Sequence, residues 1–296
     1  MKLKYTVNEN TRHTTVRQIL KSPFGMSDRL ILRLKKAGQI YCNGNVVNVN
    51  SPIHIGDVIT ADISFKEECE NILPVKMDLD ILYEDEGLLV VNKSANTPVH
   101  PSLNHYEDSL ASGVKYYFDL IGLKRKIRPI NRLDKDTSGI VLFAKNEYIQ
   151  ECLVKQMKTN EFEKEYLALV DGIVSKPLQT VIASIARKDT SIIERCVSNE
   201  GDYAETEIEL LDTYSNYSLI KCKLKTGRTH QIRVHTKHIG HPILGDTLYG
   251  SSSSLISRQA LHAHKVKFIH PITKEPLEIT CNPPEDMLEL IDNETK

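Results

Sequence analysis

Three polar segments of the sequence carry residues that could do chemistry, and each adjoins a run of apolar residues. The first, 128–139, reads RPINRLDKDTSG and holds two carboxylates two positions apart, Asp134 and Asp136. In an extended segment the two would share one face, as the acid and base pair of a glycoside hydrolase requires. The same letters are ordinary turn chemistry, with Arg132 and Asp134 as a surface ion pair. The spacing alone leaves both interpretations open.

The second segment, 163–172, is a strand-like run that ends in a glycine. Lys164, Tyr166 and Ala168 alternate with other residues and therefore share one face of the expected strand. A tyrosine in this position is more often a core or rim residue than a catalytic one. The pattern by itself predicts a strand and no reaction.

The third segment, 224–242, reads LKTGRTHQIRVHTKHIGHP, with four histidines at 230, 235, 238 and 241. His230 and His235 are five residues apart, which a helix rotates off a common face, and no His-Glu-x-x-His pattern is present. We therefore expect no metal site. The segment's cations suit phosphate or carboxylate contacts better, and they are Arg228, Arg233 and Lys237.

Strands and one helix must position these segments. Apolar patterning predicts strands at 88–92, 139–144, 166–170 and 218–225. The first three runs are almost continuously apolar, which is typical of strands buried on both faces, whereas the last alternates between apolar residues and lysines. A helix is expected over 229–239, ended by Gly240 and Pro242. This order predicts an α+β fold: a mixed, mainly antiparallel β-sheet flanked by helices.

The N-terminal part differs from the rest in charge. Residues 1–62 contain nine Lys and Arg against four Asp and Glu, a net charge of +5, while the remainder of the chain carries −6. Ser27 is a suitable N-cap for a helix over 28–37, on which Arg29, Arg33 and Lys36 share one face. Asn43-Gly44 then predicts a hairpin turn. The segment resembles the small α/β RNA-binding module named after ribosomal protein S-four, and the three cations would contact phosphates.

Length and composition set the remaining bounds. With 296 residues, two domains are expected: a basic RNA-binding domain at 1–65 and a larger domain at 77–296, joined by an acidic linker at 66–76. No apolar run is long enough to span a membrane, and the six scattered cysteines have no C-x-x-C pair, which indicates reduced thiols. We expect a cytoplasmic monomer without membrane contact.

The three polar segments together resemble the RluA/RluD-like pseudouridine synthases. The resemblance covers about residues 75–290 and rests on six ordered motifs, among them NRLDKDTSG at 131–139, KxYxA at 164–168 and GRTHQIR at 227–233. Further matches lie at 81–93, 240–250 and 261–271. The basic N-terminal module is a common attachment in this family.

The resemblance implies a reaction and a role for particular residues. Uridine would be isomerised to pseudouridine in RNA, a reaction that neither gains nor loses atoms and therefore needs no redox cofactor or metal. Asp134 would be the essential carboxylate, acting as a nucleophile on the anomeric carbon or as a base on the adjacent sugar carbon. Arg233 would pair with it through its fork of donors, and Tyr166 would stack on the target base. Arg132 and Arg228 would contact RNA.

The substrate and two departures from the family pattern remain expectations. Large-subunit ribosomal RNA is favoured because the N-terminal module is typical of the ribosomal branch; transfer RNA and a noncatalytic RNA-binding ribosome-assembly factor are the alternatives. The family commonly has Lys-Pro-Ala-Gly where this chain has KSAN at 93–96, and often His at Asn131. Asn96 can keep a turn with positive φ. The departures affect the expected substrate fit at the pocket rim.

Overall fold

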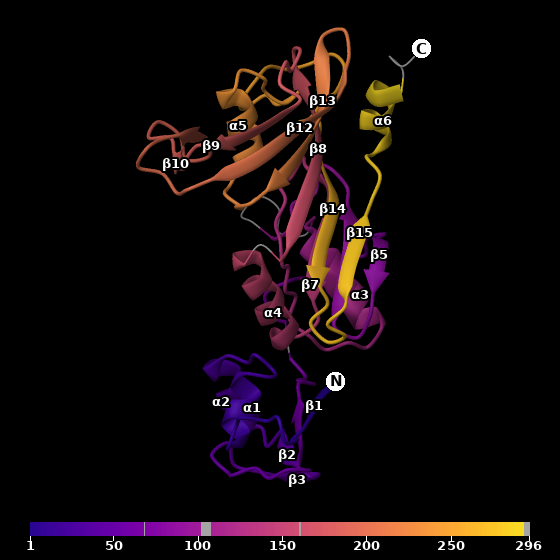
Figure 1. The fold of residues 1–296 in the computed structure, drawn as a ribbon. Coiled ribbons are helices and arrows are strands. Elements are labelled where there is room, and N and C mark those ends of the chain that lie inside the picture. The colour runs from indigo at the N-terminus through magenta and orange to yellow at the C-terminus, as the bar shows by residue number, and fades with distance from the viewer. Residues whose placement is uncertain (68, 102–107, 160, 293–296) are drawn as a thin grey trace.

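The chain folds as α+β, as predicted, in a computed structural model that describes residues 1–67, 69–101, 108–159 and 161–292 (Figure 1). Its helices are α1 (Val16–Lys21), α2 (Asp28–Lys36), α3 (Leu110–Leu120), α4 (Glu147–Lys158), α5 (Gln231–His238) and α6 (Glu285–Asp292). Its strands are β1 (Lys2–Thr6), β2 (Ile40–Cys42), β3 (Asn45–Val46), β4 (Val58–Asp62), β5 (Asp80–Glu84), β6 (Leu88–Lys93), β7 (Ser138–Ala144), β8 (Glu163–Asp171), β9 (Leu178–Ile182), β10 (Ile185–Arg187), β11 (Arg195–Val197), β12 (Glu205–Thr213), β13 (Tyr217–Leu224), β14 (Leu261–Ile269) and β15 (Pro276–Thr280).

A nine-stranded sheet forms the body of the molecule. Its strands run in the order β5-β6-β7-β14-β8-β13-β12-β9, and β15 pairs with β14. The neighbours are antiparallel except for β7 and β14, which pair in parallel at Gly139 and Ala263. This parallel contact brings the start of β7, directly after the first polar segment, beside β14. The prediction of a mixed, mainly antiparallel sheet is confirmed.

The predicted strands are also confirmed, and their patterns have the expected cause. In β6, Leu89 and Val91 face the cluster that contains α3, whereas Leu88 and Val90 face the cluster that contains α4. The near-continuous apolar run is therefore buried on both faces. The lysines of β13 lie on the outer face and form a ladder with glutamates of the neighbouring strands, through Lys221–Glu209, Lys223–Glu163 and Lys225–Glu207.

The N-terminal residues form a second, four-stranded sheet in the order β1-β4-β2-β3, with α1 and α2 beside it. The predicted helix is present, and Ser27 caps it by accepting a hydrogen bond from the Leu30 backbone N–H at 3.1 Å. The predicted hairpin turn is present too, since Asn43 and Gly44 both have positive φ, as its tight turn requires.

This N-terminal module packs directly against the rest of the chain, on the side of α4 (Figure 1). One apolar cluster continues from Leu30 and Leu34 in the module to Leu142 and Leu153 in the larger part. The Tyr148 hydroxyl donates a hydrogen bond to the Phe24 carbonyl at 3.0 Å. The second face of β6 and β7 and the helix α4 thus share one apolar cluster with the module. The division at 1–65, 66–76 and 77–296 stays a prediction.

No helix in the described ranges is both long and apolar enough to cross a membrane. The six cysteines carry free thiols.

The parallel contact between β7 and β14 requires glycine at position 139. Gly139 has a φ of +113°, and an added Cβ would lie 2.3 Å from the Ala263 carbonyl oxygen. We predict that Gly139→Ala lowers the free energy of unfolding by at least about 3 kcal/mol, because the backbone of β14 must move. Gly122→Ala is the control: it has positive φ but no atom within 4 Å, and should cost about 1 kcal/mol. Equal losses in denaturant unfolding would contradict the argument.

Candidate active site

The first polar segment is a turn, held in place by its neighbours. The Thr137 N–H donates to the Asp134 carbonyl at 3.1 Å, so Asp134 and Asp136 do not stand on an extended strand. The side chain of Asn131 donates to the Ile140 carbonyl and accepts from the Leu142 N–H, both at 2.9 Å, and thereby ties the segment to β7. The geometric premise of a paired-carboxylate hydrolase is therefore missing.

A buried lysine holds the same turn from the other side. Lys93, at the end of β6, donates hydrogen bonds to the carbonyls of Ser94, Thr97 and Lys135 at 2.8–2.9 Å. Asn96 lies in the turn between two of these carbonyls with a φ of 60°, as predicted for this departure from the family pattern. Of the two departures, Asn131 ties the loop that carries Asp134 to β7, and Asn96 keeps the turn after β6.

Arg233 connects Asp134 to a second, fully buried carboxylate. Its Nη1 donates to Asp134 Oδ2 at 2.9 Å, while Nε and Nη2 donate to the two oxygens of Asp246 at 2.7 and 2.9 Å. The fork of donors therefore grips Asp246, which is 0% exposed, and Asp134 receives a single bond. The pairing of Arg233 with Asp134 is as expected from the resemblance, but the expected two-donor contact is made with Asp246.

Burial governs the electrostatics of the three charged groups Asp134, Arg233 and Asp246. Burial opposes the charge of Arg233, but hydrogen bonds and attraction from Asp246 and then Asp134 outweigh it, so the pKa of Arg233 is raised. Asp246 also accepts from the Leu248 and Tyr249 backbone N–H groups. With its orientation fixed in this way, Arg233 holds the carboxylate of Asp134, whose side chain is 29% exposed, at the edge of the cleft.

His230 is a second neighbour of Asp134. Its Nε2 lies 3.8 Å from Asp134 Oδ2, and its Nδ1 lies 2.8 Å from the Tyr249 hydroxyl, which accepts from the Arg195 N–H. Burial lowers the pKa of His230, although the charge of Asp134 opposes this. The histidine is therefore neutral at neutral pH.

The strand and helix around this site differ slightly from their predicted bounds. The helix α5 begins at Gln231, because His230 has a φ of 57° and stands outside it.

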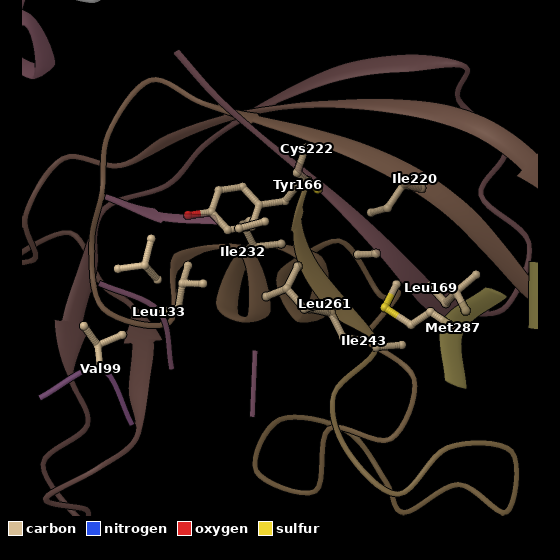
Figure 2. Packing of buried hydrophobic residues seen from close by; sticks show 14 of the residues in the cluster. Val99, Leu133, Tyr166, Leu169, Ile220, Cys222, Ile232, Ile243, Leu261 and Met287 are labelled. Atoms are coloured by element: carbon tan, nitrogen blue, oxygen red, sulfur yellow. The ribbon is translucent and has the colours of Figure 1, made fainter. Parts of the chain in front are cut away.

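Tyr166, on β8, is 7% exposed and packs in the main apolar cluster (Figure 2). Burial, and then the charge of Asp134, raise the pKa of Tyr166. Its side chain is consequently a neutral phenol at physiological pH.

Two connected spaces open beside Asp134. The inner chamber, of about 70 Å³, is lined by four aliphatic side chains and by a larger number of polar ones, among them Asp134, Tyr166 and Arg233. The outer cleft, of about 580 Å³, shares seven lining residues with the chamber, including Asp134, Tyr166, Arg132 and Arg228. Its lining carries one carboxylate, that of Asp134, and four cations, which are Arg132, Lys164, Lys225 and Arg228. A cationic cleft that leads to a carboxylate beside a buried aromatic ring suits a polyanion that inserts one group.

The other histidines of the third segment point to separate partners. His235 is buried between the Thr206 hydroxyl and the Ala183 carbonyl, and His241 faces the Asp171 carbonyl. Within the described ranges no group of three or more His, Cys, Asp or Glu side chains is arranged to hold a metal ion.

The three cations predicted for the N-terminal module have different surroundings. Arg33 lies over the Phe65 ring and forms ion pairs with Glu67 at 2.8 Å and Glu147 at 2.7 Å. Arg29 is also 3.3 Å from Glu147, but its side chain is 87% exposed. Lys36 is exposed at the end of α2. The three therefore do not form one solvent-facing row, because Arg33 bridges the module to the larger part of the chain.

Comparison with known proteins agrees with this geometry. A sequence model described as RNA pseudouridylate synthase matches residues 87–238. A Bacillus subtilis relative named uncharacterized RNA pseudouridine synthase YlyB is 40% identical over 262 residues, or 87% of this chain and 86% of the relative. The chain belongs to the RNA pseudouridylate synthase family.

Two further relatives of this pseudouridylate synthase have more specific names. Ribosomal large subunit pseudouridine synthase D of Xylella fastidiosa is 34% identical and covers 86% of this chain and 81% of its own. The solved structure of human RNA pseudouridylate synthase domain containing 1 superposes with a TM-score of 0.61 at 26% identity, over 73% of this chain and 87% of that one.

Sequence reasoning missed part of the synthase site. Asp246 stood in a matched motif without a role, and no spacing rule joins it to Arg233, 13 residues earlier. For His230, the sequence suggests only the role of a metal ligand. Asp246 and His230 both lie in polar stretches that the family resemblance covers, and this position is the feature of the sequence that could have identified them.

Because Arg233 binds Asp134 and Asp246 at once, a substitution that keeps its charge but changes the shape of its side chain should impair the site. We predict that Arg233→Lys lowers kcat by about 10- to 100-fold, because one ammonium cannot grip Asp246 with a fork and also reach Asp134. Affinity for RNA should change less than about 2-fold. Single-turnover kinetics and a binding titration measure the two effects separately. Normal turnover with weakened binding would instead make Arg233 a phosphate contact.

A buried histidine behind the turn gives the fold a pH dependence. His262 Nδ1 lies 3.0 Å from the Ser138 hydroxyl, and burial lowers the pKa of His262 to about 4. Between pH 6.5 and 4 the unfolded chain therefore binds more protons at this residue, so acidification destabilises the fold. We predict that the free energy of unfolding, measured by urea titration, falls less steeply on acidification in His262→Gln than in the wild type. The difference between the two slopes should reach up to about 1.4 kcal/mol per pH unit. Parallel pH profiles would contradict this.

Proposed function

We propose that the cleft at Asp134 isomerises uridine in large-subunit ribosomal RNA. The RNA pseudouridine synthase activity is that of the family; the observation that carries the proposed site is the oriented Asp134 carboxylate where a cationic cleft meets a smaller chamber. The cleft would bind the RNA strand and the flipped uridine, with the reacting atoms of that uridine beside Asp134 and Tyr166. Isomerisation leaves the number of atoms unchanged, so the reaction needs neither a redox cofactor nor a metal.

Each residue of the chamber then has a defined task. Asp134 attacks the anomeric carbon of uridine or removes the proton from the adjacent sugar carbon, and both routes need an ionised carboxylate held in place. Arg233 supplies that hold. Tyr166 offers its ring to the base and prevents the detached uracil from leaving, while Arg132 and Arg228, which line both the chamber and the cleft, bind the RNA strand.

The choice of ribosomal RNA is supported by relatives named ribosomal large subunit pseudouridine synthase D, which match at 30–37% identity. Transfer RNA is the alternative substrate. A noncatalytic assembly factor has no use for the buried chain of charges that orients Asp134. We further propose that the protein acts in the cytoplasm as a monomer.

The N-terminal module would add RNA contacts at a distance from the chamber. Arg29 and Lys36 present exposed cations, and Arg29 also lines a second cleft of about 690 Å³ between the module and the larger part of the chain. Lys66 and Lys126 line the same cleft. Arg33, which is engaged with two carboxylates, would fix the orientation of the module.

Pseudouridine mapping tests the proposed function directly. Total RNA from cells with and without the gene should differ at one or more uridines of the large-subunit ribosomal RNA. Loss of signal in transfer RNA alone would support the alternative substrate, and no loss in any RNA would contradict the function.

The mapped sites also test the role of Asp134. We predict that Asp134→Asn fails to restore pseudouridine in cells that lack the gene, although the variant folds and binds RNA, because an amide is neither a nucleophile nor a base here. Asp136→Asn is the matched control and should restore most of the signal, since the Asp136 carbonyl, not its carboxylate, contacts Arg258. Restoration by Asp134→Asn would sink the assignment.

A further inference from the structure

Lys164 is a cation of the outer cleft that has no hydrogen-bond or ion-pair partner within the part of the chain that the structure describes. It stands on β8 two residues before Tyr166, so both side chains face the cleft. Its ammonium packs beneath the loop before α5, where a Cβ on Gly227 would lie 3.2 Å from Nζ. Burial lowers the pKa of Lys164, and no charged group offsets this.

The nearest carboxylates in the sequence cannot serve this lysine. Glu163 and Glu165 flank it, but the alternation of the strand turns them to the opposite face, where Glu163 pairs with Lys223 at 2.5 Å. Lys225 and Arg228, on the facing wall of the cleft, are paired with Glu207 and Asp202. Among the described residues no hydrogen bond or ion pair holds the Lys164 ammonium.

A partly buried ammonium without a counter-charge is unfavourable, so the free protein leaves this position prepared for an anion. The exposed Arg132 guanidinium can be hydrated, whereas Lys164 has lost much of its water to Gly227 and the cleft wall. The site thus selects a ligand that carries its own negative charge to the mouth of the chamber.

The division between the two spaces indicates which part of the substrate carries the negative charge that Lys164 binds. Asp134 and Tyr166 line both the chamber and the cleft, but Lys164 lines only the cleft. A nucleotide whose reacting atoms lie beside Asp134 and Tyr166 leaves its attached phosphates in the wider cleft, where Lys164 lies. A contact with the base carbonyls would require Lys164 to reach into the chamber, whose lining does not include it.

We propose that Lys164 binds a backbone phosphate adjacent to the target uridine and so anchors the flipped nucleotide. This rests on the proposed function and extends it to a residue with no assigned role. Lys164 would be a substrate-binding residue, and Asp134 would remain the reacting group.

The first test measures affinity. Lys164→Gln should weaken binding of a fluorescein-labelled oligouridylate about 10-fold and reduce the slope of log affinity against log salt by about one phosphate contact, while Lys164→Arg retains most of both. Lys223→Gln, on the outer face of the neighbouring strand, is the matched control and should bind like the wild type. An unchanged salt slope in Lys164→Gln overturns the proposal.

The second test locates the phosphate. A short RNA around the mapped uridine is prepared with one neutral methylphosphonate on either side of that uridine. One of the two methylphosphonates should weaken RNA binding by the wild type about 10-fold. The same methylphosphonate should not weaken RNA binding by Lys164→Gln any further. If Lys164→Gln instead binds normally but loses turnover at saturating RNA, the lysine acts on the base and the proposal fails. A wild type that binds but forms no pseudouridine contradicts the proposed function alone.

Discussion

The guanidinium of Arg233, shared between Asp246 and Asp134, is the interaction on which the rest of the site depends. Arg233 is the charged partner of the buried Asp246, and among the described residues it makes the one hydrogen bond to the Asp134 side chain. Breaking such a buried pair on one side leaves an uncompensated charge, which is strongly destabilising. The arrangement therefore couples the stability of α5 and the following loop to the orientation of Asp134, the proposed reacting carboxylate.

The sheet serves this interaction by bringing distant segments together. The parallel contact of β7 with β14 sets the turn that carries Asp134, and Lys93 at the end of β6 ties that turn to a third strand. The N-terminal module shares an apolar cluster with α4 and with the face of β6 and β7 that is turned away from α3. A module that is packed rather than loosely tethered would hold its own RNA contacts at a fixed distance from the chamber.

Much of this fold follows from local patterns. The buried strands, the lysine face of β13 and the Ser27 cap were predictable because side-chain alternation and capping act between near neighbours in sequence. The family resemblance singled out Asp134, Tyr166 and Arg233, and the structure places all three around one chamber.

What sequence reasoning could not supply are contacts set by tertiary packing. The fork of Arg233 was assigned to Asp134, since nothing in the spacing shows that Asp246 folds back onto α5. Arg33 looked like a phosphate contact because helical periodicity shows which residues share a face, but not what packs against that face. Its partners Glu67 and Glu147 lie 34 and 114 residues away.

The most direct test of this account is the turnover of the double variant Arg233→Met, Asp246→Asn. Replacing both members of the buried pair leaves no fully buried charge without a partner, so the protein should fold with nearly normal stability, unlike Arg233→Met alone. Asp134, whose side chain is 29% exposed, would lose its anchor. We predict turnover below about one hundredth of the wild-type rate at saturating RNA. A well-folded double variant with normal turnover would show that Asp134 needs no positioning by Arg233, and would contradict the account.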